Sequence, residues 1–202
     1  MMIKLSNITK TYDGKTVLDN FSAEFGKGAY CVTGPSGTGK TTLLHIVLGL
    51  VKADAGSVTA CHQSCPPDPA FVPAVQPTFS AVFQEDRLCE NLSAVKNVAL
   101  VCPKKFPKER IIEELRLVGL GDDLNKQTVF YSGGMKRRVA IVRALIMTAD
   151  AIVMDEPFKG LDDKLKNDVI AYIKERVKDK IFIFVSHDRS DAAALNAELI
   201  EL

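Results

Sequence analysis

The sequence predicts an α/β fold with a mainly parallel sheet. Two apolar runs, residues 151–155 and 181–186, have the length of strands, and a segment with helical spacing precedes each of them. Buried parallel strands are continuous apolar runs of this kind, and right-handed helical crossovers join them. A third apolar run, residues 30–33, leads into a glycine-rich loop. A chain of 202 residues can bury a full core, so we expect a single domain over residues 1–202.

The elements that flank the first helix are expected to be strands and turns. Apolar and polar residues alternate over 21–25, which predicts a strand with one buried face, and turns are expected at 13–14 and 26–28. Apolar residues at helical spacing predict a helix over 40–50. Residues 57–82 hold five of the nine prolines, so we expect irregular or edge-strand structure there instead of a helix.

The later part of the chain is expected to contain most of the helices. From about residue 86 to 127 the pattern is mostly helical, and one helix is entered through Pro107. After Tyr131 the α/β pattern resumes, with helices expected over about 133–147 and 162–177. The sequence therefore predicts one α/β core that is interrupted by a helical insertion.

Composition limits the classes of function. The formal net charge is +1, so there is no basic surplus of the kind that binds nucleic acid, and we expect no nucleic-acid partner. No apolar run approaches the roughly 20 residues that span a bilayer, and no secretory signal is visible. Five cysteines without a regular framework are typical of reduced thiols in a cytosol. These features predict a cytoplasmic location.

The segment 34–41 carries the strongest functional signal. It fits the pattern of a glycine, four residues and then Gly-Lys-Thr, whose backbone N–H groups bind phosphates together with the following helix N-terminus. In this pattern Lys40 reaches the β- and γ-phosphates and the Thr41 hydroxyl binds Mg²⁺. A chance glycine-rich turn is the alternative, but a predicted strand precedes the loop and a predicted helix follows it. The ATP-binding residues predicted here are Gly34, Pro35, Ser36, Gly37, Thr38, Gly39, Lys40, Thr41 and Thr42.

Two adjacent acids end the predicted strand 151–155. The carboxyl end of a parallel strand beside a phosphate loop is where Mg²⁺ and an attacking water are needed. Asp155 is therefore expected to hold Mg²⁺, and Glu156 to orient the water and accept its proton. The alternative is a solvated strand end with acidic turn residues.

Several further motifs occur in the order that is found in one protein family. The chain resembles the nucleotide-binding subunit of an ATP-binding cassette (ABC) transporter over nearly its whole length. Besides the phosphate loop and the acidic strand, the matching motifs are Phe83-Gln84-Glu85-Asp86 (Q-loop), Tyr131-Ser132-Gly133-Gly134-Met135 (signature), Gly160-Leu161-Asp162 (D-loop) and Ser186-His187-Asp188 (switch histidine).

The resemblance implies a P-loop NTPase fold with a mainly parallel sheet, a small antiparallel β-subdomain and a short helical subdomain inserted at about 86–130. It implies that Gln84 binds Mg²⁺ or its water and that His187 contacts the γ-phosphate. Tyr12 stands where the family stacks an aromatic ring on adenine. Each has a plainer alternative. Gln84 could be an ordinary polar loop residue, His187 a structural histidine, and Tyr12 a ring that only packs within a strand.

The signature segment is the reason to expect a dimer. Ser132 is a natural helix N-cap, and the two glycines leave room for a phosphate at the helix end. A well-capped helix is the alternative, and it explains the serine but not both glycines. In the family, Ser132, Gly133 and Gly134 would complete the ATP site of a partner subunit, and Asp162 would act across the same interface.

The resemblance predicts an ATPase subunit that powers transport, with ATP and Mg²⁺ as cofactors. Expected partners are transmembrane permease subunits, a second ATP-binding subunit, most simply an identical one, and a solute-binding protein, at the inner face of the cell membrane. The segment 83–88 resembles the nitrate/sulfonate/bicarbonate importer branch, and residues 87–101 are the expected docking face for the permease or, equally, core of the insertion. The alternatives are a soluble non-transport ABC ATPase, a P-loop kinase and a non-hydrolysing regulatory subunit.

Two residues depart from the family signature, and one further segment suggests a metal site. The family signature usually begins with leucine and has glutamine fifth, whereas Tyr131 and Met135 stand here. Cys61, His62 and Cys65 suggest a metal site, but structural zinc usually takes four ligands and no second pair lies nearby. We expect a loop with reduced thiols there.

Overall fold

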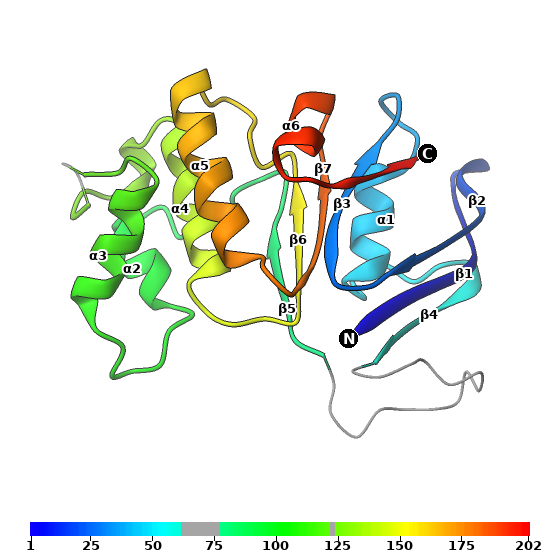
Figure 1. Cartoon of the computed structure of the whole chain (residues 1–202), viewed down its shortest axis with the longest axis horizontal. Coiled ribbons are helices and arrows are strands. Elements are labelled where there is room, and N and C mark those ends of the chain that lie inside the picture. The colour runs from blue at the N-terminus through cyan, green and yellow to red at the C-terminus, as the bar shows by residue number, and fades with distance from the viewer. Residues whose placement is uncertain (62–76, 122–123) are drawn as a thin grey trace. The chain divides into compact units, whose positions relative to one another are not determined.

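The computed structural model describes residues 1–61, 77–121 and 124–202. The chain forms two compact units: residues 1–79, 149–155 and 177–202 make the first, and residues 80–148 and 156–176 the second. Both are drawn in Figure 1. No helix within the described ranges is both long and apolar enough to cross a membrane.

The first unit contains a three-stranded antiparallel sheet. Its order is β2 (Lys15–Phe25), β1 (Met2–Tyr12), β4 (Ala55–Cys61). The hairpin between β1 and β2 turns at Asp13 and Gly14, both with positive φ, which short polar residues and glycine tolerate. Alternate residues of β1, among them Ile3 and Leu5, are buried, as the period-2 pattern of a half-buried strand requires.

The same unit holds a parallel sheet with the order β6 (Ala151–Asp155), β7 (Ile181–Val185), β3 (Gly28–Thr33), β8 (Glu198–Glu201). Every residue of β6 and β7 is buried. Helix α1 (Lys40–Val47) packs on these two strands (Figure 1). Residues from both sheets and from α1 form one hydrophobic core.

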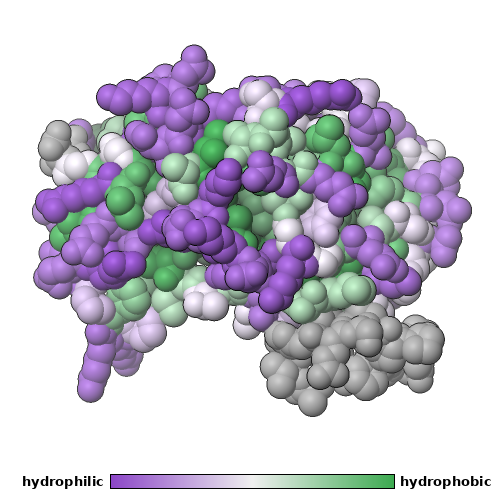
Figure 2. Space-filling model, in the orientation of Figure 1, coloured by the Kyte–Doolittle hydropathy of each residue, from purple (hydrophilic) through white to green (hydrophobic). Residues whose placement is uncertain are grey.

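The second unit is mostly helical. It contains β5 (Phe79–Val82), α2 (Ala94–Ala99), α3 (Lys108–Leu117), a 3₁₀ turn (Thr128–Phe130), α4 (Gly133–Leu145) and α5 (Asp163–Arg176). Helix α2 packs on α3 and α4, and α5 packs on both α3 and α4 (Figure 1). Hydrophilic side chains cover much of the surface that Figure 2 shows. The exposed large apolar side chains of this unit include Leu117 and Phe130.

The predicted fold class is confirmed, but several boundaries and one segment were wrong. The helix expected over 40–50 ends at Val47, because Gly49 has a φ of +69°. The described residues of the stretch 86–127, which was expected to be mostly helical, form only the helices α2 and α3, with loops between them. Of the proline-rich region, β4 and β5 are the edge pieces that were expected, and residues 62–76 lie outside the described ranges. Helix α6 (Arg189–Ala194) and β8 were not predicted.

Candidate functional site

The glycine-rich loop runs between β3 and α1 and closes around the side chain of Lys40. The Lys40 ammonium donates hydrogen bonds to the carbonyls of Gly34 at 2.9 Å and Pro35 at 2.7 Å, and the residue is only 8% exposed. Gly39, with a φ of +93°, caps α1, and a Cβ there would lie 2.6 Å from the carbonyl oxygen of Val17. Glycine is therefore required at this position by both conformation and space.

The Thr41 hydroxyl and the Asp155 carboxylate meet at the ends of α1 and β6. Thr41 donates a hydrogen bond to Asp155 Oδ2 at 2.7 Å, and Asp155 is buried. Two neighbouring oxygen ligands of an octahedral Mg²⁺ lie about 3 Å apart, since each sits about 2.1 Å from the ion. The spacing and the chemistry of these two oxygens therefore fit the Mg²⁺ that was predicted here.

The switch segment follows β7 and is fixed by a buried serine. The Ser186 hydroxyl donates to Asp191 Oδ2 at 2.5 Å and accepts a hydrogen bond from the Asp188 backbone N–H at 3.1 Å. His187, between them, is exposed and lines a pocket of about 340 Å³ together with Gly34, Pro35 and Arg189. The first unit thus places His187 beside the phosphate loop. Behind this segment, burial raises the pKa of Cys31 to about 11, which keeps the thiol protonated at neutral pH.

Tyr12 lies at the end of β1 and is 43% exposed. The Lys10 ammonium sits 5.1 Å from the centre of its ring. Plain strand packing does not account for a ring with this exposure, so the ring is available to stack on a planar ligand. Its expected contact with adenine stays a prediction.

The signature segment forms the first turn of α4 in the second unit. The Ser132 hydroxyl caps the helix by accepting a hydrogen bond from Met135 N at 3.3 Å. A Cβ at Gly134 would lie 2.8 Å from the carbonyl oxygen of Gly160, so helix packing explains this glycine. A Cβ at Gly133 would meet nothing within 4 Å among the described residues. Packing does not explain Gly133, and its open backbone leaves room for a phosphate.

Glu156 and Asp162 flank the turn between β6 and α5. Glu156 has a φ of +48°, which is rare for a residue with a long side chain and is found mostly where function demands it. Its carboxylate lies 3.0 Å from the Lys159 ammonium. Asp162 accepts a hydrogen bond from Leu165 N at 2.9 Å, so its carboxylate caps α5.

Gln84 lies in the loop after β5, and its side chain is exposed. Its backbone carbonyl accepts a hydrogen bond from Arg137 of α4 at 2.6 Å. Sequence reasoning missed Arg137 and the neighbouring Arg138, although both are almost fully buried. Two adjacent arginines directly before the apolar residues Val139–Val142 of α4 are the signal that could have pointed to them, because buried guanidinium groups need specific acceptors.

The remaining residues named in the sequence differ in their burial. Val95 and Val98 of the expected docking face 87–101 are buried core residues, whereas Leu100 and Val101 are exposed. Tyr131 and Met135, the two departures from the signature, line a pocket of about 210 Å³ in the second unit. Residues 62–65 lie outside the described ranges, as does the side chain of Cys61. Elsewhere in the described part of the chain, no three side chains of His, Cys, Asp or Glu cluster as metal ligands.

Comparisons with known proteins agree with this geometry. The ABC transporter family model matches residues 18–159. The spermidine/putrescine import ATP-binding protein PotA of Mycoplasma capricolum is 35% identical over 98% of this chain and 58% of its own length. PotA of Pasteurella multocida is 33% identical over 100% of this chain and 55% of its own length. The chain thus spans a little over half the length of these curated relatives.

Solved structures extend the comparison to the fold. A dimeric, post-hydrolysis form of the ATP-binding cassette MJ0796 bound to ADP and phosphate superposes with a TM-score of 0.82. It is 28% identical, and the match covers 99% of this chain and 94% of that one. A second dimeric structure of the same bacterial ABC transporter cassette gives a TM-score of 0.80 at 29% identity. With a family model that spans most of the sequence, these findings show that the chain belongs to the ABC transporter family and has the ATP-binding cassette fold.

Proposed function

We propose that this chain is the ATP-binding and ATP-hydrolysing subunit of an ABC importer. The observation that carries the proposal is the contact between Thr41 and Asp155 directly after the loop that encloses Lys40. This group provides a cation, a hydroxyl and a carboxylate in the order that a Mg²⁺–nucleotide complex requires. We further propose that residues 1–202 form a single ABC ATPase domain with a helical insertion at about 86–130. The helices α2 and α3 lie within this range and support the insertion.

The proposed hydrolysis assigns one task to each of four side chains. Lys40 binds the β- and γ-phosphates, and Glu156 orients the attacking water and accepts its proton. His187 would donate a hydrogen bond to the γ-phosphate, and Gln84 would hold the metal through its amide. Thr41, Asp155 and Gln84 would hold Mg²⁺, whose charge would offset the negative charge on the phosphates.

The proposed active form is a pair of cassettes with two shared ATP sites. Ser132, Gly133 and Gly134 of one subunit contact the ATP that the phosphate loop of the other holds, and Asp162 acts across the same interface. The dimeric MJ0796 structures support this arrangement, and so does the open backbone of Gly133. An identical partner is the simplest assignment.

The proposed partners are permease subunits and a solute-binding protein, at the inner face of the cell membrane. The PotA relatives are named as spermidine/putrescine import ATP-binding proteins, which supports import. The likeness of residues 83–88 to the nitrate/sulfonate/bicarbonate branch stays a prediction, because the relatives found here are named for a different cargo. A soluble non-transport ABC ATPase is not favoured, since these relatives are importer subunits.

The test is Glu156→Gln, which keeps the size of the side chain and removes the proton acceptor. We expect ATP binding within about twofold of the wild type and a fall in turnover of at least about 100-fold, as loss of a general base predicts. Nucleotide affinity is measured with a fluorescent ATP analogue and turnover by phosphate release. Turnover at the wild-type rate in this variant would remove Glu156 from its assigned role.

A further inference from the structure

The backbone around Gln84 is held by a single arginine of α4. Arg137 Nη1 donates to the Phe83 carbonyl at 2.7 Å, and Nη2 donates to the Gln84 carbonyl at 2.6 Å. Its Nε lies 3.1 Å from Asp86 Oδ1. One planar guanidinium therefore reaches the loop at three places, on both sides of the Gln84 side chain.

A second arginine of α4 continues the same attachment. Arg143 donates to the Asp86 carbonyl and to the Arg87 carbonyl, each at 2.9 Å. The Arg87 guanidinium, in turn, lies 3.9 Å from the centre of the Phe83 ring, and Arg87 has a φ of +47°. These contacts hold the loop in a conformation that includes the positive φ of Arg87.

Burial makes the attachment through Arg137 strong. Its side chain is 5% exposed and that of Asp86 is 18% exposed. Burial raises the pKa of Asp86, while the charges of Arg137, Lys136 and Arg143 lower it. A buried guanidinium that loses its acceptors leaves charged donors unpaired, which is costly in a low dielectric. The loop therefore cannot leave α4 without a large free-energy cost.

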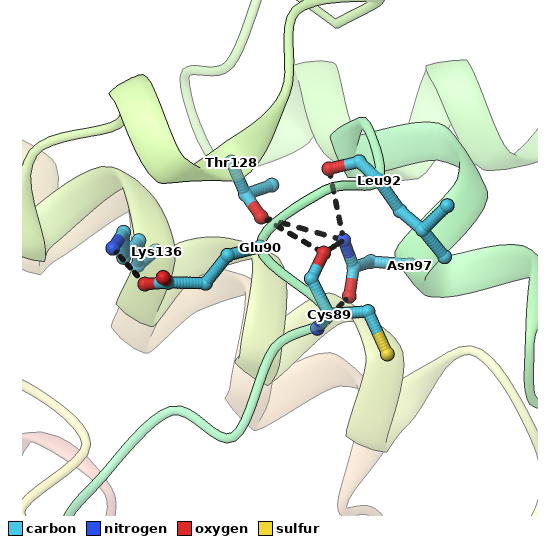
Figure 3. Close-up of polar contacts among 6 residues, drawn as sticks. All are labelled: Cys89, Glu90, Leu92, Asn97, Thr128 and Lys136. Carbon is cyan, nitrogen blue, oxygen red and sulfur yellow. Dashed lines mark hydrogen bonds and ion pairs between the residues drawn. The ribbon is translucent and has the colours of Figure 1, made fainter.

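The far end of the loop is fixed as well. Asn97 of α2 accepts a hydrogen bond from Cys89 N at 2.8 Å and donates one to the Cys89 carbonyl at 3.0 Å. Next to it, Lys136 of α4 binds the Glu90 carboxylate at 2.6 Å. Figure 3 shows both contacts on the same turn of the chain. Residues 83–90 are thus bound to helices along their whole length.

We propose that Arg137 is a positioning residue for Gln84 and that it joins Gln84 to the helix that begins at Ser132. The proposal rests on the proposed function, in which these two residues serve different ATP sites. Because Arg137 lies on α4 only five positions after the cap, a displacement of the helix N-terminus by a partner's nucleotide is passed to the loop of Gln84. Arg137 thereby couples the two ATP sites of a dimer.

The first measurement is hydrogen–deuterium exchange of Arg137→Lys. Lysine keeps the charge but cannot reach two carbonyls and a carboxylate at once. We expect faster exchange at the amides of 83–90, with the exchange of α5 and the parallel sheet unchanged. We also expect kcat to fall by about 10- to 100-fold, as misplacement of a catalytic group predicts, while ATP affinity stays within about twofold. Asp86→Asn, which leaves the two carbonyl bonds of Arg137, serves as a milder variant with the same direction of change.

The decisive measurement is a double-mutant cycle with Gln84→Ala. If Arg137 acts through Gln84, Arg137→Lys lowers kcat by less than about twofold further in the Gln84→Ala background. If Arg137→Lys lowers kcat equally in both backgrounds, Arg137 does not act through Gln84, and the proposal is overturned.

The matched control is Arg176→Lys, which alters a guanidinium bound to Glu114 in the same unit, away from the loop. It should lower thermal stability and leave the exchange of 83–90 unchanged. If Arg137→Lys gives the same pattern as this control, the proposal fails although the ATPase assignment stands. Absence of ATP hydrolysis by the wild-type protein would instead overturn the proposed function.

Discussion

At the scale of single residues, the two glycines of the signature segment have different physical reasons. Gly134 lets the first turn of α4 approach the carbonyl of Gly160, where a methyl group would lie at 2.8 Å. No described atom lies near the equivalent position of Gly133. Glycine is less favourable than alanine within a helix, and no packing contact among the described residues requires it at Gly133, the first residue of α4. Phosphate binding is the explanation that we propose for it.

This difference predicts opposite outcomes for two alanine variants. Gly134→Ala should lower the free energy of unfolding by about 1–3 kcal/mol, because the added methyl group overpacks the contact with Gly160. Gly133→Ala should leave it unchanged or raise it by up to about 1 kcal/mol. In ATP, however, Gly133→Ala should weaken dimer formation. Urea unfolding and light scattering measure the two effects, and a loss of stability in Gly133→Ala would show that packing requires this glycine too.

At the scale of elements, α3 and α5 are joined by a buried acid. Glu114 accepts a hydrogen bond from the Tyr172 hydroxyl at 2.8 Å and forms ion pairs with Arg176 and, at 2.9 Å, with Arg110. Burial raises the pKa of Tyr172, so the phenol stays protonated and donates throughout the physiological pH range. The two helices therefore share a polar contact within an apolar interface.

Tyr172→Phe tests how much this contact stabilises the helices. Loss of a hydrogen bond to a charged acceptor should lower the free energy of unfolding by about 1.5–3 kcal/mol. Tyr30→Phe is the control, since the Tyr30 hydroxyl accepts only a neutral backbone bond from Gly26 at 3.1 Å, and it should cost about 1 kcal/mol or less. Urea unfolding measures both variants. Equal losses would show that the charge of Glu114 adds nothing to the contact.

Sequence periodicity predicted the elements that are buried on all sides and failed where tertiary contacts decide. Strands β6 and β7 are continuous apolar runs, so their prediction needed no knowledge of the rest of the fold. The start of the stretch 86–127 was wrongly expected to be helical, because residues 83–90 hold their shape through Arg137 and Arg143, which are more than 50 positions in sequence from the residues that they bind. Gly133 and Gly134 look alike in the sequence, and only their neighbours in space separate their roles.

At the scale of the whole molecule, the proposed function gives each chain parts of two incomplete nucleotide sites. The phosphate loop and His187 belong to the first unit, and the signature segment belongs to the second. In the proposed dimer, one chain contributes Lys40 to one ATP and Ser132 to the other. Catalysis would then depend on protein concentration as well as on nucleotide.

Ser132→Arg tests this dependence directly. In the Glu156→Gln background, ATP should convert the protein to a dimer, whereas the added Ser132→Arg should leave it monomeric, because a bulky side chain would fill the phosphate position. Each monomer should still bind nucleotide within about threefold of the parent, since the phosphate loop is unchanged. Size-exclusion chromatography with light scattering gives the mass, and nucleotide titration gives the affinity. A dimer in the Ser132→Arg variant with ATP would contradict the shared site.

The closed loop around Lys40 affects how variants of this residue are interpreted. Its ammonium cross-links the loop by binding the carbonyls of Gly34 and Pro35. The ammonium has three N–H donors, so a contact with both the β- and γ-phosphates must displace at least one of these carbonyls. Lys40→Ala would therefore remove both the proposed nucleotide contact and the internal hydrogen bonds of the loop, so its loss of activity would measure two effects together. The affinity of this loop for nucleotide is thus a difference between two sets of hydrogen bonds, and weakening the internal set would raise it.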